Sequence, residues 1–557
     1  MKNFRNVIFV TIILFISAGM VMAGGGQGSG AQPASGVKVS PPGQLPIVTQ
    51  DVTLEIGLRQ SANITDLANN FFTKYIRDKT GISITHRVFA SNANDSNTQL
   101  ELMISSNEKL PDIIIWNTPN WQTYGDDGIF INLAPYFAKD AYFVDKMIAK
   151  FRLPDDKDLL RISCTTPGGK RVGFPYYQDD RSQSFSSMNF INTKWLDNLN
   201  LKMPSTTDEF YQTLIAFRDR DPNKNGLKDE LPFLGTLAGG GEALIFLINS
   251  FVYHPFMGLN NDYLNVTNGK IWAPWVTEEY RDALRYISKL YKEGLIMPST
   301  FTVTPNEIAV IVSIKEGEPE VVGSFSGSVA TVFIPDTPAL FDYRIQQPLI
   351  GPKGVNFYPL RGNSIRPNAF ITKDCAIPEV AFRFLDFCWD PDTAMISTYG
   401  EPNVDWQWLE PGFFGNMGDP ATFERINLIG AMNHNKTWGS SPAMFWIDKV
   451  NNWSKFIDDE TWRSYRFKPY GQMGDLYEGK DVPEKISLIV YNRDENNLIR
   501  DMRTSIQSYR EECLSLFSTG QMDIERDWNT YLSNLDRMGL KTYLDTAQKA
   551  YTRTIGK

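Results

Sequence analysis

The polar segment from Asp221 to Glu230, which reads DPNKNGLKDE, holds the residues best suited to binding an ion. Its first half alternates oxygen-bearing side chains as an EF-hand calcium loop does, at Asp221, Asn223 and Asn225. Gly226 suits the sharp turn at the sixth position of such a loop, and Leu227 has a backbone carbonyl for the seventh. The first half of the segment therefore resembles a calcium loop.

The second half of this segment departs from the EF-hand pattern. Pro232 stands at the twelfth position, where an EF-hand has a bidentate glutamate, so Asp229 and Glu230 would have to complete the coordination sphere. A turn rich in Asn and Asp also forms without an ion, because these side chains hydrogen-bond to the nearby backbone. The spacing alone leaves both interpretations open.

Motifs for catalysis are missing from the sequence, which contains no Walker A loop, no HExxH and no GxSxG. The three histidines, His86, His254 and His434, are scattered and lack the spacing of metal ligands. Carboxylates occur in pairs such as Asp179 and Asp180, but a glycosidase needs two that face each other about 5 to 9 Å apart. Neighbours in sequence do not show that arrangement, so these groups are interpreted as structural or solvated residues.

The elements that must position such residues begin with an alternation of strands and helices. Hydrophobic periodicity predicts strands over 52–58, 82–89 and 112–116, and helices over 64–79 and 98–105. This order is typical of parallel βαβ units. In open parallel sheets ligands bind beyond the carboxyl ends of the strands, so the residues that follow the third strand are candidates for a binding site.

Helix signals recur through the rest of the chain. Capping residues predict helices that begin after Thr206, after Thr277 and at Pro378. Apolar stripes predict two C-terminal helices over 498–516 and 528–535. We interpret these stripes as core.

Composition indicates a soluble globular protein of more than one lobe. The chain has 557 residues, 42% of them hydrophobic and 21% charged, which is too apolar for disorder and too long for one core. Its net charge of −9 argues against general binding to nucleic acid or to anionic membranes.

The N-terminus has the pattern of an export signal. Lys2 and Arg5 precede an apolar run over 7–16, and small residues lead to a cleavage site after Ala23. The alternative is an N-terminal membrane anchor, but the run is short for a span of about 20 residues. No cysteine stands at the cleavage site, so we expect a free protein in a periplasm or outside the cell. Residues 24–49 are rich in Gly, Ser and Pro and predict a flexible tether.

The four cysteines show no metal or redox spacing; they are Cys164, Cys375, Cys388 and Cys513. Cys375 and Cys388 flank one predicted helix, which would hold them about 20 Å apart, too far to bridge. Other pairings stay open, and each cysteine is interpreted as a small buried hydrophobe.

Six segments spread over most of the chain carry a resemblance to a known family. They are LPDI at 110–113, GFP at 173–175, the region 207–232 with the DPNKNGLKDE loop, GKIWAPWVTEEYRDALRYISKLYKEGLI at 269–296, and the segments 371–408 and 519–551. Together they resemble the family 1 extracellular solute-binding proteins of ABC importers, especially the long subgroup that includes alginate-binding and lipoprotein-type sugar binders.

The resemblance implies an α/β fold of two lobes with the ligand in the cleft between them and closure by hinge motion. By this analogy the N-terminal lobe takes 50–178 and 350–400, and the C-terminal lobe takes 180–348 and 405–557. In alginate-binding relatives the same loop holds a structural calcium ion, and its ligand positions map onto Asp221, Asn223, Asn225, Leu227, Asp229 and Glu230. Many relatives carry a lipid-attachment cysteine directly after the leader, which this sequence lacks.

The resemblance predicts a periplasmic protein that binds an oligosaccharide and delivers it to a membrane permease. It also predicts that the protein is a monomer and is not an enzyme. Sugar binders combine flat aromatic rings with polar partners. The aromatic candidates are Trp116, Trp121, Tyr124, Tyr176, Tyr177, Trp406 and Trp408. The polar candidates are Asn117, Asp179, Asp180 and Arg181. The alternatives are a secreted carbohydrate-active hydrolase or lyase, and a sensor that presents its ligand to a receptor.

Overall fold

The computed structural model describes residues 36–150, 157–179, 188–237, 243–255, 263–303, 307, 311, 318–327, 342–360, 364–414, 420–427, 429, 433–439, 445–447, 476–486 and 488–555. The chain divides into two units, Met1–Val37 and Lys38–Lys557, and the helices and strands named below all belong to the second unit. The predicted signal peptide, residues 1–23, lies outside the described residues, as does the first part of the predicted tether.

Residues 38–50 form an ordered segment, which we call the N-terminal strap. Val39 and Val48 form an antiparallel bridge, and the backbone N–H of Ser40 donates to the carbonyl of Ile47 over 2.9 Å. Ile47 and Val48 are buried. The prediction of a flexible tether is therefore wrong for residues 38–49, because this part of the segment has apolar side chains that join the core.

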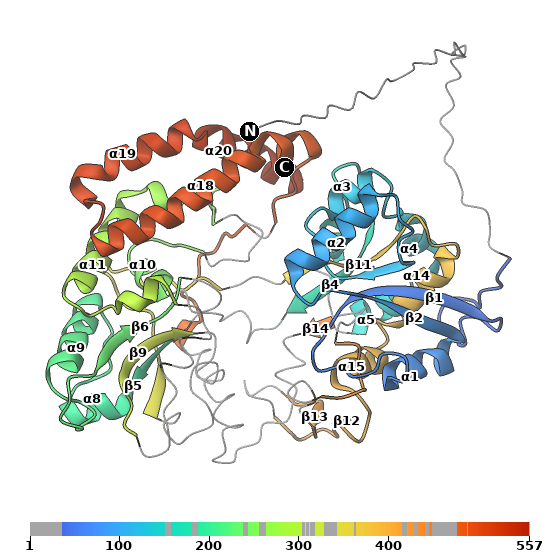
Figure 1. Ribbon diagram of the computed structural model, residues 1–557, viewed down its shortest axis with the longest axis horizontal. Helices are drawn as coiled ribbons and strands as arrows, with labels where there is room; N and C mark the ends of the chain where they lie inside the picture. The colour runs from blue at the N-terminus through green and yellow to red at the C-terminus, as the bar shows by residue number, and fades with distance from the viewer. Residues whose placement is uncertain are drawn as a thin grey trace, which may run out of the picture. The chain divides into compact units, whose positions relative to one another are not determined.

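A six-stranded mixed sheet is built around the first predicted βαβ units, with the order β14-β4-β11-β3-β1-β2 (Figure 1). Its strands are β1 (Val52–Arg59), β2 (Ile82–Phe89), β3 (Ile113–Ile115), β4 (Gly173–Asp179), β11 (Ser364–Ile371) and β14 (Phe445–Ile447). β1 pairs in parallel with both β2 and β3, which confirms the predicted parallel units. β11 runs antiparallel to β3 and to β4.

Helices cover both faces of this sheet, and Figure 1 shows α1 and α2 on opposite sides of the β1–β2 pair. The helices are α1 (Phe71–Thr80), α2 (Ala93–Ser105), α3 (Trp121–Asp126), α4 (Ala134–Asp140), α5 (Phe143–Lys150), α6 (Lys157–Ser163), α14 (Pro378–Phe387) and α15 (Pro391–Tyr399). The helix predicted over 64–79 begins later than expected. Asn70 is its N-cap, because the Asn70 side chain accepts a hydrogen bond from the Phe72 backbone N–H over 3.0 Å.

The described residues between 405 and 447 contribute to the six-stranded sheet and its surroundings. β14 pairs in parallel with β4, with Phe445 opposite Tyr177. The indole N–H of Trp438 donates to the Thr73 hydroxyl in α1 over 2.8 Å, and Trp438 is buried. The prediction that 405–557 forms part of the C-terminal lobe is therefore wrong for this part of the chain, while the remaining lobe boundaries stay a prediction.

The second sheet is four-stranded, with the order β10-β5-β9-β6. Its strands are β5 (Met188–Asn192), β6 (Leu231–Leu234), β9 (Val322–Gly327) and β10 (Tyr343–Gln346). Helices α8 (Thr193–Leu199), α9 (Thr207–Asp219), α10 (Ala243–Ile248) and α11 (Glu278–Lys292) accompany it. The capping box predicted from Thr206 and Glu209 is present at α9, and Thr277 caps α11 as predicted.

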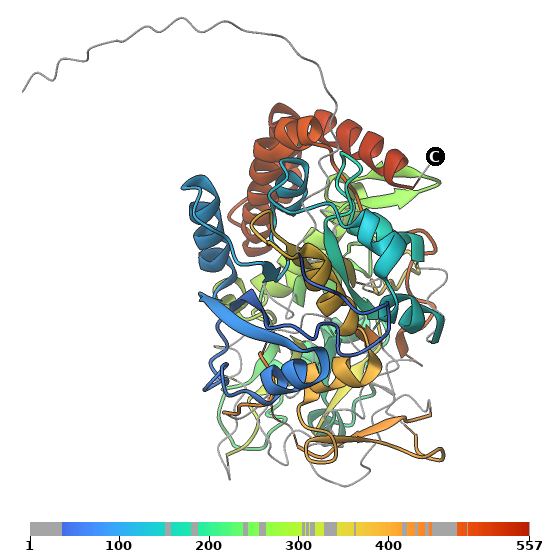
Figure 2. The same ribbon diagram turned by 90° about the vertical axis from the view of Figure 1, so that its right-hand side faces the viewer.

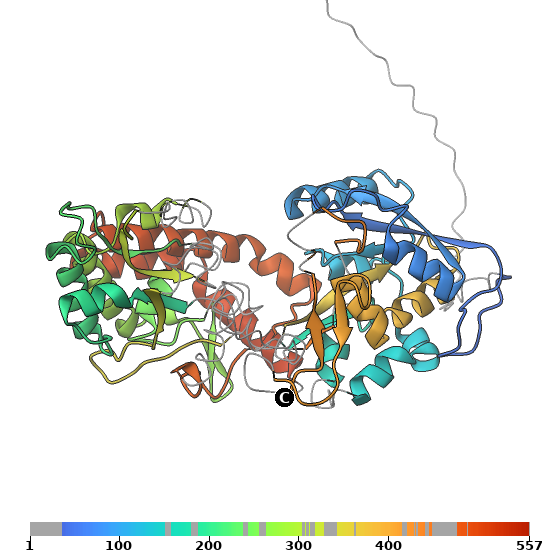
Figure 3. The same cartoon turned by 90° about the horizontal axis from the view of Figure 1, so that it is seen from below.

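Three C-terminal helices pack into the same core as α9 and α11, and Figure 3 shows them in red. They are α18 (Arg493–Thr519), α19 (Ile524–Arg537) and α20 (Leu540–Thr554). Ile506, Trp528 and Tyr543 supply one buried residue from each helix. The stripe predicted over 498–516 is correct in its middle, where Ile506 and Cys513 are buried, but not at its two ends. Ile499 is buried where Leu498 was expected, and Phe517 is buried where Leu516 was expected.

Two short hairpins and two 3-10 turns complete the described elements. The hairpins pair β7 (Asn265–Thr267) with β8 (Lys270–Trp272) and β12 (Trp406–Trp408) with β13 (Phe423–Arg425), the latter in orange in Figure 2. The turns are η2 (Pro274–Val276) and η3 (Pro298–Phe301). In the part of the chain that the structure describes, no helix has the length and apolar character needed to span a membrane.

Candidate functional site

The carboxyl ends of β1 and β3 bring a polar and aromatic cluster to one edge of the six-stranded sheet. The strands are parallel, so Arg59 at the end of β1 and Trp116 just beyond β3 lie at the same edge. Asn97 in α2 joins them, because its side-chain oxygen accepts from the Trp116 indole N–H over 3.1 Å and from Arg59 Nη2 over 3.3 Å. The sequence prediction identified Trp116 but missed Arg59 and Asn97.

Trp116 is a buried member of this cluster. Its ring packs against Phe89 with centroids 4.8 Å apart, and it belongs to the core that includes Ile114 and Phe370. Asn117, the next residue, is exposed. The predicted sugar platform at Trp116 is therefore packed against protein, whereas Asn117 is open to a ligand.

The other aromatic candidates near this sheet are mostly buried as well. Tyr124 lies against Phe130, with ring centroids 5.6 Å apart, and both Tyr176 and Tyr177 in β4 are buried. Trp121 is half-buried at the start of α3. The low exposure of Tyr124, Tyr176 and Tyr177 indicates core packing in this conformation.

The side chains of three predicted polar candidates lie outside the described part of the structure. Asp179 is the last residue of β4, where only its backbone is described, and Asp180 and Arg181 lie outside the described residues. Their role as ligand partners stays a prediction.

The two remaining tryptophans lie on the same strand, β12, and differ in their exposure. Trp406 is 1% exposed and its indole N–H donates to the Gly400 carbonyl over 2.9 Å. Trp408 is 45% exposed, and its indole N–H donates to Asp392 Oδ1 over 2.8 Å. The hydrogen bond to Asp392 fixes the orientation of an exposed ring, so Trp408 suits stacking against a ligand.

The predicted calcium loop forms a closed turn between α9 and β6. Asp221 Oδ1 accepts from the Asn225 backbone N–H over 3.1 Å, and Asp221 Oδ2 accepts from the Gly226 N–H over 3.2 Å. The φ of Gly226 is 76°, a left-handed value that glycine adopts without strain. Asp229 Oδ2 accepts from the Asn225 side-chain nitrogen over 3.0 Å. The loop thus folds its polar side chains inward.

Glu230 provides an observation that fits a cation in this loop. Its Oε1 atom is buried without a hydrogen-bond partner. Burial, together with the nearby carboxylates of Asp229 and Asp221, raises the pKa of Glu230 above its usual value. A calcium ion would satisfy the oxygen and offset the repulsion, because calcium takes six to eight oxygen ligands.

Side-chain amides and a backbone carbonyl must share in such a site. Among the described residues, no group of three or more His, Cys, Asp or Glu side chains has an arrangement that could hold a metal ion. Asn223 and Asn225 supply amide oxygens and Leu227 a carbonyl, which calcium accepts as ligands. The residues present therefore fit calcium better than a metal that requires imidazole or thiolate ligands.

The cysteines and histidines take structural positions. The cysteines, Cys164, Cys375, Cys388 and Cys513, are all free and buried, as interpreted from the sequence. Burial lowers the pKa of His86 to about 4 and that of His254 to about 3. A histidine with so low a pKa stays neutral at physiological pH.

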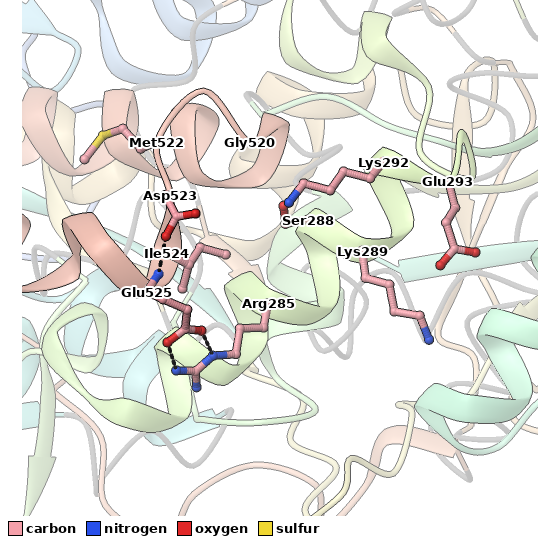
Figure 4. Close-up of a pocket in the computed structure, with 10 residues that line it drawn as sticks. All are labelled: Arg285, Ser288, Lys289, Lys292, Glu293, Gly520, Met522, Asp523, Ile524 and Glu525. Atoms are coloured by element: carbon pink, nitrogen blue, oxygen red, sulfur yellow. Dashed lines mark hydrogen bonds and ion pairs between the residues drawn. The ribbon is translucent and has the colours of Figure 1, made fainter.

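A cavity of about 350 Å³ lies away from these residues, between α11 and the turn that joins α18 to α19 (Figure 4). Arg285 Nε donates to Glu525 Oε1 over 2.6 Å on one side of it. Asp523, also in its lining, caps α19 by accepting from the Glu525 backbone N–H over 3.0 Å. None of the predicted ligand residues lines this cavity, and Arg285, Glu525 and Asp523 in its lining already bind one another's side chains or backbone.

An α/β fold with two sheets, and with polar and aromatic side chains at the carboxyl edge of parallel strands, is typical of a protein that binds a solute. The model of the bacterial extracellular solute-binding protein family matches residues 61–395 of this chain. The chain belongs to this family, which confirms the predicted family and the prediction of a binding protein instead of an enzyme.

The chain is similar along most of its length to a curated relative. It is 26% identical over 435 residues to the fructooligosaccharide ABC transporter substrate-binding protein FusA of Streptococcus pneumoniae serotype 4, covering 73% of this chain and 74% of FusA. It is also 30% identical over 244 residues to lipoprotein LipO of Bacillus subtilis, covering 41% of this chain and 45% of LipO.

Solved structures confirm the α/β solute-binding fold. The S. pneumoniae FusA complex with kestose matches with a TM-score of 0.71 and 22% identity, over 90% of this chain and 99% of FusA. The alginate-binding protein AlgQ2, solved without calcium ion, matches with a TM-score of 0.62 and 21% identity, over 90% of this chain and 98% of AlgQ2.

Proposed function

We propose that this protein is the substrate-binding component of an ABC importer, which captures an oligosaccharide and delivers it to a membrane permease. The observation that carries the proposal is the similarity to FusA over about three quarters of both chains, 73% and 74%. Binding in a cleft between two lobes that close by hinge motion is part of the proposal. A monomer suffices for this role.

Titration calorimetry with defined oligosaccharides tests the proposed function. Neutral fructooligosaccharides such as kestose are the first probes, because FusA was solved with kestose. Saturable binding without turnover of the sugar is the expected result. Hydrolysis or elimination of the oligosaccharide by the purified protein would favour the carbohydrate-active enzyme instead.

We expect Trp408→Ala to weaken oligosaccharide binding by about 1 to 3 kcal/mol, the range of aromatic contacts at binding sites, without loss of stability. The ring is 45% exposed and held by Asp392, so its removal leaves little cavity. Calorimetry measures the affinity, and a thermal melt measures the stability.

The matched control is Trp406→Ala on the same strand, whose ring lies 5.3 Å from that of Trp408. Trp406 is buried, so this control should lower the melting temperature strongly. Equal affinity of wild type and Trp408→Ala would remove Trp408 from the binding site.

We also propose a structural calcium ion in the Asp221–Glu230 loop. The buried, unpartnered Glu230 oxygen and the inward-facing side chains of Asp221 and Asp229 support it. One solved FusA structure is of an EF-hand mutant, and AlgQ2 was solved without calcium ion, which supports calcium binding among relatives. Because the loop joins α9 to β6, its ion would stabilise the fold without contacting the sugar.

Chelation should lower the melting temperature of the purified protein, and added calcium should restore it better than magnesium. Calcium bound only to the folded state adds about 2.7 kcal/mol when its concentration is one hundred times the dissociation constant. Magnesium demands a stricter octahedral geometry, which fits mixed amide and carboxylate ligands less well.

Asp221→Ala should abolish the response to calcium. Asp219→Ala, outside the loop, is the control and should keep it, because Asp219 pairs with Arg218. A wild-type melting curve that ignores both chelator and calcium would show that the loop is an ordinary Asn-rich turn.

For localisation, we propose export to the periplasm with cleavage after Ala23. The family is extracellular, and the leader predicted from Lys2, Arg5 and the run over 7–16 supports export. LipO is a lipoprotein by name, whereas residue 24 of this chain is Gly24 and not cysteine. N-terminal sequencing of the exported protein distinguishes a free from a lipid-modified terminus.

A further inference from the structure

Arg59 lies at the edge of the six-stranded sheet where ligands of open α/β sheets bind. It is the last residue of β1, which lies between β3 and β2 in the sheet. Both neighbours run parallel to β1, so the carboxyl ends of all three strands lie at one edge. Ligands of open α/β sheets bind outside this edge.

The protein holds the Arg59 guanidinium in one orientation. Arg59 Nε donates to the Ser96 hydroxyl over 2.7 Å, and Nη2 donates to Asn97 Oδ1 over 3.3 Å. The guanidinium carbon lies 5.5 Å from the centroid of the Trp116 ring. Both α2 and the residue after β3 therefore position this side chain.

One nitrogen of the guanidinium remains unused. Arg59 Nη1 has no hydrogen-bond partner among the described residues, and it is not one of their fully buried, unpartnered atoms, so solvent reaches it. Nη2 donates one of its two hydrogens to Asn97 and keeps the other. The outer edge of the guanidinium thus presents free donors in a fixed fork.

The charge of Arg59 also lacks an opposite partner. In the described part of the chain no carboxylate forms an ion pair with it, whereas Arg87 on the neighbouring strand pairs with Glu55 over 3.0 Å. Burial lowers the pKa of Arg59, which reflects partial desolvation of this charge. A half-buried cation without a counter-ion gains most from a ligand that supplies oxygen acceptors.

We propose that Arg59 is a ligand-contacting residue that donates from its free guanidinium edge to a pair of sugar oxygens. The pair is either two neighbouring hydroxyls of a neutral sugar or the carboxylate of a sugar acid, since both accept two parallel N–H donors. This inference rests on the proposed function, because it names a residue of the same binding site.

The test measures the affinity of wild type, Arg59→Met and Arg59→Lys for two sugars in solution. Kestose is the neutral probe and trigalacturonate is the acidic probe. Arg59→Met should weaken binding at least tenfold with a melting temperature close to that of wild type. Arg59→Lys keeps the charge but loses the fork, so it should rescue a carboxylate ligand partly and a neutral diol hardly at all.

Ionic strength distinguishes the two ligand sources. Affinity for trigalacturonate should fall as salt is added, because screening weakens the contact between opposite charges, whereas affinity for kestose should stay nearly constant. Arg87→Met is the control and should bind as wild type does, since Arg87 is already paired with Glu55.

The outcomes separate the inference from the function beneath it. If wild type binds a sugar and both Arg59→Met and Arg59→Lys bind it with an affinity within twofold of wild type, only the role of Arg59 is overturned. Wild type that binds no neutral or acidic oligosaccharide would overturn the proposed function and this inference with it.

Discussion

Acidification from pH 7 to pH 4 should destabilise the wild-type protein by about 3 kcal/mol more than the His254→Phe variant. His254 is 3% exposed and its ring packs nearly parallel to Tyr280, with an interplanar angle of 24°. Burial, and then the charge of Arg510, lowers the pKa of His254 to about 3. The folded protein therefore keeps this imidazole neutral.

The direction follows from the two pKa values of His254. The unfolded chain binds the proton at a pKa of about 6.5, well above the folded value, so acid favours unfolding. The stability that neutral His254 provides is complete above about pH 6.5 and is lost progressively as the pH falls toward the folded pKa. The phenylalanine variant has no proton to bind and lacks this loss.

Urea denaturation at pH 7 and pH 4 measures the effect, with the difference between the two pH values compared across variants. His434→Gln is the control, because His434 is only half-buried and the variant should keep most of the acid sensitivity. Each variant retains His86, so its contribution cancels. Equal losses for wild type and His254→Phe would contradict the assignment.

Arg383→Met should destabilise the protein by about 3 kcal/mol and release the N-terminal strap. Arg383 in α14 is 2% exposed, and its two terminal nitrogens donate to the carbonyls of Ser40 and Pro41 over 2.8 and 2.9 Å. Methionine fills much of the same volume but leaves both carbonyls, which are partly buried, without their charged donor.

Hydrogen exchange combined with a denaturant titration measures both parts of this prediction. Amides of the strap, such as that of Ser40, should exchange faster in Arg383→Met, and the unfolding midpoint should fall. The control is Arg77→Met, since Arg77 is exposed and pairs only with the exposed Asp78. An unchanged midpoint with unchanged exchange of the strap would show that Arg383 does not hold it.

Local signals in the sequence predicted the elements whose formation depends on nearby residues. The capping box of Thr206 and Glu209 starts α9 as expected, because a cap satisfies backbone donors within one turn. Hydrophobic periodicity likewise located β1 and β2, and in β1 the alternate residues Val52, Leu54 and Ile56 face the core. The polar loop from Asp221 to Glu230 forms a turn for the same local reason.

Pairings between distant residues could not be read from the chain. β14 joins β4 from more than two hundred residues away, so the assignment of 405–447 to the C-terminal lobe was wrong. The strap residues 38–49 have the composition of a linker, yet Arg383 holds them through backbone carbonyls. Carbonyl acceptors have no sequence signature, since every residue has one.

The candidate binding site shows the same division. The sequence by itself determined the family, the parallel βαβ units and the presence of aromatic residues beyond β3, because these depend on local patterns and on motifs. Only the tertiary structure decided that Trp408 is exposed and Trp406 is buried. It also placed the Arg59 guanidinium near the Trp116 ring, where Arg59 donates to Asn97. Exposure and side-chain contact depend on how strands and helices far apart in the chain pack together, and a linear pattern does not contain that information.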